Sequence, residues 1–252
     1  MLLVVGSAKG APGATTVATG LAASLPGGRV LLVEADPHGG DLAARFGHAD
    51  TPGLASAATA ARHGTGPGWP DQHVQRLPLG VPVLLAPPAA EPAAAAVSML
   101  AGHLDALAAY VSTVVVDVGR LVPGSPAAPL VDAADVVLLV SVPRLDGLSH
   151  AAAGLSTMDP PVRGRVRLVL GGDGGHRSAG YPAAEVARDL DVPVAGVMPV
   201  DRRGAAVLAG RHRPARGWRL LPLPRAIGQL AASLAGATGR DGVGIAVAGG
   251  GP

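Results

Sequence analysis

The sequence predicts an α/β fold, in which helices cover both faces of a doubly wound, mostly parallel sheet. Short apolar runs of strand length alternate with helical segments along most of the chain, as in βαβ units. Right-handed crossovers would place the loops at 6–16, 35–41 and 118–128 along one carboxyl edge of this sheet, where ligands bind. No long polar linker divides the 252 residues. We therefore expect a single domain at 1–238, followed by a glycine-rich, disordered tail at 239–252.

Each element is predicted from its apolar pattern and from the glycine, proline and acidic residues at its ends. Strands are expected at Leu2–Val5, Arg29–Glu34, Val81–Ala86, Thr113–Asp117, Asp135–Ser141, Arg165–Leu170 and Val192–Val197. Helices are expected at Val17–Leu25, Pro92–Tyr110, Leu145–Met158, Ala183–Leu190 and Pro224–Leu234, with a further helix starting near Asp201. The stretch from Thr51 to Pro82 predicts only short alanine-rich helical pieces, broken by glycine and proline.

Composition narrows the class of protein. Hydrophobic residues make up 48% of the chain, but the longest apolar runs are much shorter than the roughly 20 residues of a membrane-spanning helix. Because the start of the chain has no basic segment typical of a signal peptide, we expect a soluble, cytoplasmic protein. The absence of cysteine excludes disulfides and thiolate chemistry, and 2% aromatic residues count against base stacking on nucleic acid.

A glycine-rich run, Gly6–Thr16, lies between the first strand and the first helix, which is the context of a phosphate-binding loop. Aligned with G-x-x-x-x-G-K-S/T, the run has Ala8 at the first glycine, Gly13 at the second and Ala14 at the lysine. Thr15 keeps the hydroxyl that binds Mg²⁺. The ordinary loop is therefore incomplete, since its lysine is missing.

Lys9 is the only lysine in the chain, among 19 arginines. The run Lys9-Gly-Ala-Pro-Gly-Ala-Thr15 resembles the deviant loop K-G-G-x-G-K-S/T of MinD/ParA ATPases, whose early lysine contacts nucleotide phosphates across a dimer interface. The other interpretation is a Gly/Ala-rich surface turn with an incidental lysine. The resemblance implies ATP binding by Lys9, Gly10, Ala11, Pro12, Gly13, Ala14, Thr15 and Thr16.

Two acidic residues end predicted strands. Asp117 follows an apolar run in the manner of a Walker B aspartate, which holds Mg²⁺ opposite the loop hydroxyl of Thr15. The segment Glu34-Ala-Asp36-Pro-His-Gly resembles the family's D-x-D-P-x-G, with Glu34 replacing the first aspartate. The resemblance implies that Asp36 lies near the γ-phosphate and attacking water, so that Asp36 and Lys9 are catalytic and Thr15, Asp117 and Asp36 surround the metal. Without nucleotide chemistry, Asp36 would form a helix cap or an Asx-turn.

Later segments continue the resemblance with departures. Pro199 and Asp201 match the family's P-x-D segment, which borders the base, although Asp201 is equally suited to cap the following helix. Gly171 stands where the family often has an adenine-reading asparagine. Arg120 replaces the usual small or proline-rich start of the loop after the Walker B strand.

Seven arginines and no acidic residue lie between Arg202 and Arg225. The family resemblance implies non-specific DNA binding by such a basic surface, and the alternative is a solvated face in an arginine-rich chain.

The chain lacks the sequence patterns of other functional classes. There is no G-x-G-x-x-G fingerprint, no metal-ligand spacing among the histidines and no G-x-S-x-G elbow. The continuation G-D-L-A resembles the CpaE/TadZ branch of the family. We expect an ATP-dependent homodimer that hydrolyses ATP weakly and positions Tad pilus or secretion machinery, without direct membrane insertion. The alternatives are a hydrolysis-deficient scaffold and a partitioning protein that binds DNA.

Overall fold

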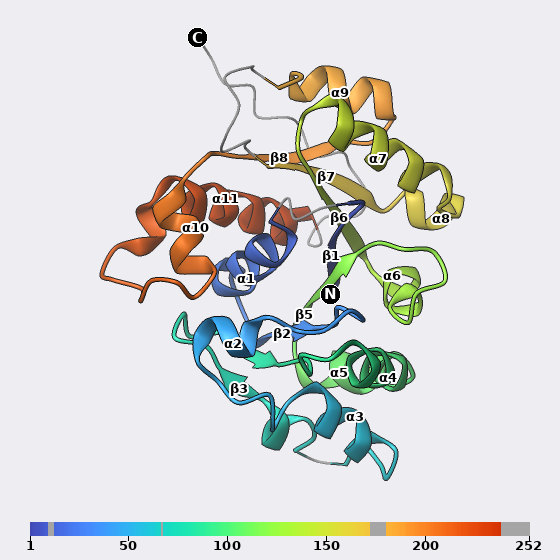
Figure 1. Ribbon diagram of the computed structural model, residues 1–252, viewed down its shortest axis with the longest axis vertical. Helices are drawn as coiled ribbons and strands as arrows, with labels where there is room; N and C mark the ends of the chain where they lie inside the picture. Colours follow the sequence, from blue (N-terminus) through green and yellow to red (C-terminus); the bar gives the residue numbers. More distant parts are fainter. Residues whose placement is uncertain (10–12, 67, 172–179, 238–252) are drawn as a thin grey trace.

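An eight-stranded sheet forms the centre of the structure, a computed structural model that describes residues 1–9, 13–66, 68–171 and 180–237. Its strand order is β3-β4-β2-β5-β1-β6-β7-β8 (Figure 1). Neighbouring strands pair in parallel, except that β3 and β4 are antiparallel. The strands are β1 (Leu2–Ser7), β2 (Val30–Glu34), β3 (Gln75–Arg76), β4 (Pro82–Leu84), β5 (Thr113–Arg120), β6 (Val136–Ser141), β7 (Val166–Gly171) and β8 (Val194–Met198).

Helices cover both faces of this sheet, as the sequence predicts. Figure 1 shows α1, α10 and α11 on one side of the sheet and α4 to α8 on the other. The α-helices are α1 (Ala14–Ser24), α2 (Leu42–Phe46), α3 (Leu54–Ala61), α4 (Ala90–Ala101), α5 (Leu104–Tyr110), α6 (Ala128–Ala133), α7 (Leu145–Ser156), α8 (Pro160–Arg163), α9 (Ala183–Leu190), α10 (Arg202–Leu208) and α11 (Pro222–Ala237). Two short 3-10 helices, η1 (Asp71–His73) and η2 (Trp218–Leu220), lie in connections.

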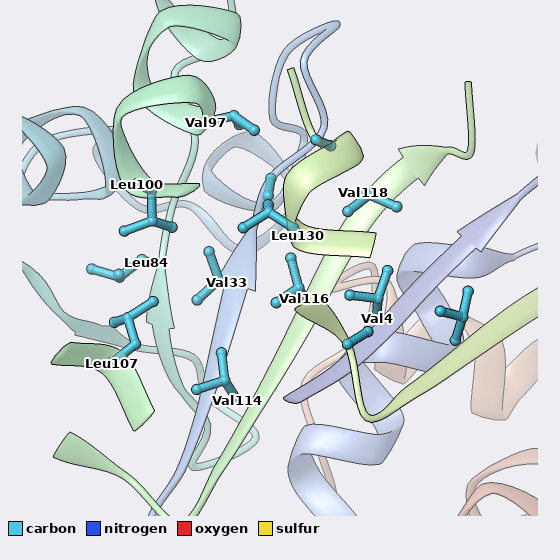
Figure 2. Packing of buried hydrophobic residues seen from close by; sticks show 14 of the residues in the cluster. Val4, Val33, Leu84, Val97, Leu100, Leu107, Val114, Val116, Val118 and Leu130 are labelled. Carbon is cyan, nitrogen blue, oxygen red and sulfur yellow. The ribbon is translucent and has the colours of Figure 1, made fainter. Parts of the chain in front are cut away.

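Side chains that alternate along the strands fill two separate cores, one on each face. Leu3 and Val5 of β1 belong to the cluster beneath α1, α10 and α11, while Val4 between them belongs to the other cluster. Figure 2 shows this second cluster, in which Val116 of β5 and Leu100 of α4 lie among other fully buried side chains. Continuous apolar strands are needed because both faces of the sheet are covered.

Several predicted boundaries are wrong. The helix expected at Pro92–Tyr110 is two helices, α4 and α5, which meet at a bend of 75° around Gly102 and His103. Strand β5 continues past Asp117 to Arg120, where a loop was expected. The helices α2, α6 and α8 and the edge strand β3 are additional to the prediction.

No single helix in the described part of the chain is long and apolar enough to span a membrane; α4 and α5 reach that length and composition only as a bent pair. The predicted tail at 239–252, and the boundary at 238, lie outside the described residues. The strands of the described residues all belong to one sheet. The single domain at 1–238 stays a prediction.

Candidate functional site

The turn from β1 into α1 lies at the middle of the sheet, because β1 is paired with β5 on one side and β6 on the other. Gly13 is the N-cap of α1 and has a left-handed backbone (φ 97°), which explains why glycine is needed there. The first turn of α1 carries no acidic side chain, so its free N–H groups present positive potential at the carboxyl edge. Of the predicted nucleotide-binding residues, Gly10, Ala11 and Pro12 lie outside the described residues.

A cleft of about 720 Å³ opens beside this turn. It has three walls, and the sequence predicted that residues of the first two would meet at the carboxyl edge of the sheet. One wall is the loop segment Gly13–Thr16, another comprises Asp36 and the end of β5 at Gly119 and Arg120, and the third is α10. Lys9 is exposed and is not among the residues that line the cleft.

Thr15 and Asp117, the predicted magnesium pair, lie close together, and the Thr15 hydroxyl lowers the pKa of the Asp117 carboxyl. Asp117 is 1% exposed and also accepts the backbone N–H of Gly119 at 3.1 Å. Burial raises the pKa of Asp117 to about 6, with a smaller contribution from the negative charge of Asp36. A buried carboxylate beside another carboxylate and a hydroxyl is an environment that a divalent cation would stabilise.

Asp36 is fixed by contacts on both sides. Its Oδ1 accepts the backbone N–H of His38 at 2.9 Å, which is the Asx-turn considered above, and lies 3.1 Å from the His38 ring nitrogen Nδ1. On the other side the carboxylate lies against Gly119, where a Cβ atom would be 2.0 Å from Oδ2 of Asp36. Gly119 also has a positive φ of 61°. The glycine therefore allows the carboxylate to approach the end of β5 closely.

Glu34 is a site residue whose structural role sequence reasoning missed. It is 2% exposed, and its Oε1 accepts the N–H groups of Asp41 at 2.7 Å and Leu42 at 2.9 Å. Its Oε2 accepts the N–H of Ala86 at 3.0 Å. Burial raises the pKa of Glu34 to about 7, against the lowering effect of these hydrogen bonds. Glu34 thus holds the loop between β2 and α2, which carries Asp36, against the end of β4.

Pro199 and Asp201 are not among the residues that line the cleft. Asp201 caps α10: its Oδ1 accepts the N–H of Gly204 at 2.9 Å, and its Oδ2 accepts the N–H of Leu223 at 3.0 Å. The capping interpretation of Asp201 is confirmed. The predicted role of both residues beside a base stays a prediction.

Five of the seven arginines between Arg202 and Arg225 line two different cavities. Arg202 and Arg211 line the cleft described above. A second cavity, of about 600 Å³, is lined by Arg203, Arg213 and Arg216 together with His212 and Trp218. Arg219 stacks on the ring of Trp218, with 4.6 Å between the guanidinium carbon and the ring centroid, and donates to the carbonyl oxygen of Ala23 at 3.2 Å.

No protein-family model and no curated protein matches the chain. Solved structures do. A ParA family ATPase from Chlorobium tepidum TLS superposes with a TM-score of 0.75 at 18% identity, covering 91% of this chain and 98% of that chain.

Two further solved structures cover most of both chains. The septum site-determining protein MinD from Pyrococcus horikoshii OT3, complexed with Mg-ADP, gives a TM-score of 0.73 at 19% identity and covers 94% of this chain and 96% of that one. Cobyrinic acid a,c-diamide synthase from Mycobacterium smegmatis, with a bound ATP analogue and magnesium, gives 0.61 at 19%, with coverages of 94% and 96%. The chain therefore has the fold of the MinD/ParA P-loop ATPases.

Proposed function

We propose that the cleft binds ATP with Mg²⁺ and that the chain is a MinD/ParA-like nucleotide switch. The observation that carries the proposal is that Thr15 and Asp36 line the cleft, while the buried Asp117 is close enough to both for them to shift its pKa. MinD from P. horikoshii is complexed with Mg-ADP and the cobyrinic acid synthase with an ATP analogue and magnesium, which supports the same ligands for this fold.

The residues present fit both ligands. The N-terminal turn of α1 offers backbone N–H groups without a competing acidic side chain, as phosphate requires. Among the described residues, no group of three or more His, Cys, Asp or Glu side chains is placed to hold a metal by itself. Mg²⁺ typically binds through one or two protein ligands together with phosphate oxygens and water, and Thr15 and Asp117 would supply those protein ligands. Bound Mg²⁺ would neutralise phosphate charge during phosphoryl transfer.

Hydrolysis would depend on Asp36, which would orient the attacking water toward the γ-phosphate. The Asx-turn and the contact with Gly119 hold its carboxylate at the cleft wall. Because Ala14 supplies no cation to the phosphates, we propose slow hydrolysis to ADP and phosphate. A scaffold that binds ATP without hydrolysing it is the alternative.

The output that we propose is an ATP-dependent homodimer that positions a cellular assembly, such as Tad pilus or secretion machinery of the CpaE/TadZ type. Lys9 is exposed and lies outside the lining of its own cleft. This placement supports a contact between Lys9 and the phosphates bound by a second copy of the chain. MinD of Aquifex aeolicus, whose structure is also similar, has been solved in complex with MinC, which supports a protein partner as the readout.

Calorimetric titration with ATP tests the binding proposal. The parent chain should bind ATP more tightly with Mg²⁺ than with a chelator. Thr15→Val, which removes only the hydroxyl, should lose most of this difference, while the control Thr59→Val, on the exposed face of α3, should keep it. No heat from the parent chain at millimolar ATP and Mg²⁺ would contradict the proposal.

DNA binding is a second candidate, because Arg203, Arg213 and Arg216 line one cavity. If each contacts a phosphate, log affinity for a random duplex should fall with log salt at a slope of about −0.9 per contact. Replacing all three by Gln should flatten that slope, whereas Arg62→Gln, at the exposed C-cap of α3, should leave it unchanged. Anisotropy that shows no binding at low salt, or binding unchanged by ATP, would remove this candidate.

A further inference from the structure

The part of the cleft formed by the phosphate-binding loop lacks the usual positively charged side chain. In the ordinary phosphate-binding loop the residue before the Ser/Thr is a lysine that reaches the β- and γ-phosphates. Here that residue is Ala14, which lines the cleft and is 6% exposed. Lys9 does not line the cleft. Apart from His38, the basic side chains that line the cleft in the described residues are the arginines Arg45, Arg120, Arg202 and Arg211, and these alone carry a permanent charge.

Arg45 is already paired. Its Nη2 lies 2.5 Å from Oδ2 of Asp41, one helical turn earlier, and Asp41 also lines the cleft. This ion pair leaves little net charge for a ligand. If Arg45 left Asp41 to contact a phosphate, the Asp41 carboxylate would face the bound phosphates unpaired, and the like charges would repel each other.

Arg202 and Arg211 belong to the wall formed by α10. Arg202 is the first residue of α10, and Arg211 follows its C-terminal end. Both are exposed. They approach the cleft from the helix that packs on α1 and α11, whereas Asp117 belongs to the sheet.

Arg120 is the cation on the sheet side. It is the last residue of β5, and its Cα is in register with Ser7 at the end of β1, where the phosphate loop begins. The preceding Gly119 donates its N–H to Asp117, so the backbone that carries Arg120 is tied to the magnesium pair. The Arg120 side chain is exposed and makes no hydrogen bond or ion pair with the described residues.

We propose that Arg120 supplies the phosphate-facing charge that Ala14 lacks. The proposal rests on the nucleotide-binding function proposed above. A guanidinium is always charged and donates two parallel hydrogen bonds to phosphate oxygens, so an arginine anchored at a strand end can replace a lysine that reaches from the loop. The cation has moved from the helix N-terminus to the neighbouring strand, while the phosphate remains between them.

Moving the positive charge between positions 14 and 120 tests the proposal directly. ATP affinity with Mg²⁺ would be measured for the parent chain, Arg120→Gln, Arg120→Lys, Ala14→Lys and the double variant A14K/R120Q. Losing one charge-assisted contact should weaken binding about 10- to 100-fold in R120Q, while R120K, which keeps the charge but not the paired donors, should lose less than R120Q. In the A14K background the same R120Q change should cost less than about threefold, since a lysine then serves the phosphates. Arg62→Gln, at the exposed C-cap of α3, should have no effect.

The outcomes separate this inference from the proposed function. If the parent chain binds no ATP, both fall. If the parent binds ATP and R120Q binds equally well, the proposed function stands and the role of Arg120 is wrong. An equal loss from R120Q with and without A14K means that Arg120 does not replace the loop lysine. Thermal melting without ligand checks folding; if A14K is unfolded, R120Q binding as tightly as R120K overturns the inference by itself.

Discussion

Glu34→Gln should remove a large part of the pH dependence of stability. Burial raises the pKa of Glu34 to about 7, from 4.5. That difference corresponds to about 3 kcal/mol, because one pKa unit is worth about 1.4 kcal/mol. The folded chain binds more protons than the unfolded chain between these two pH values. The stabilising contribution of Glu34 is therefore fully present below pH 4.5 and is lost as the pH rises through 7.

Urea unfolding of the ligand-free protein measures this contribution. Between about pH 8 and about pH 5 the parent chain should gain about 2 to 3 kcal/mol more stability than E34Q. Comparing the two pH values within each protein cancels the fixed cost of placing an amide NH₂ opposite the N–H of Ala86. Glu91→Gln, at an exposed position of α4, is the control and should behave like the parent. An E34Q variant with the same pH dependence as the parent would refute the reasoning.

Three further changes have expected outcomes. Asp117→Asn should raise the melting temperature of the ligand-free chain at neutral pH, because burial raises the pKa of Asp117 to about 6, yet lose the Mg²⁺ dependence of ATP binding; unchanged calorimetry would contradict this. Gly119→Ala should cost about 1 to 3 kcal/mol in chemical denaturation, since its Cβ would lie 2.0 Å from Asp36 at a φ of 61°. Gly124→Ala, at φ 70° in open space, should cost less. Lys9→Ala should abolish dimers formed with a non-hydrolysable ATP analogue without changing the melting temperature, and light scattering that still shows dimers would make Lys9 incidental.

The sheet was predictable because its central strands are continuous apolar runs. Because both faces of the sheet are covered, β2, β6 and β7 are almost wholly apolar, and Glu34, Arg167 and Ser141 are their only polar or charged residues. Length and flanking residues were therefore enough to find these strands. The bend between α4 and α5 was missed since alanine-rich sequence continues through both helices, and only Gly102 and His103 interrupt it. The end of β5 was missed because pairing with β1 as far as Arg120 is a tertiary effect.

Some residues of the candidate site could likewise be predicted from the sequence, and others could not. Thr15, Asp36 and Asp117 follow strands or a glycine turn at recognisable spacing. In the structure Thr15 and Asp36 line one cleft, and Asp117 lies close enough to both for them to shift its pKa. The sequence around Glu34 does not indicate that its carboxylate accepts three backbone hydrogen bonds. One of the donors, the N–H of Ala86, lies far along the chain. The separation of the arginines into two cavities depends on how the segment around α10 packs, and their spacing in the sequence does not encode it.

The position of β1 gives the cleft two walls of unequal stability. Leu3, Val4 and Val5 are fully buried between paired strands, so their amide hydrogens should exchange with solvent only when the whole domain unfolds. Helix α10 is seven residues long and packs on α1 and α11 from one side, so its amides can exchange through local opening. A ligand that contacts both walls would slow amide hydrogen exchange in α10. Exchange in β1 would still depend only on the global stability of the protein. Occupancy of the cleft could thus be followed at individual amides, in the absence of any turnover.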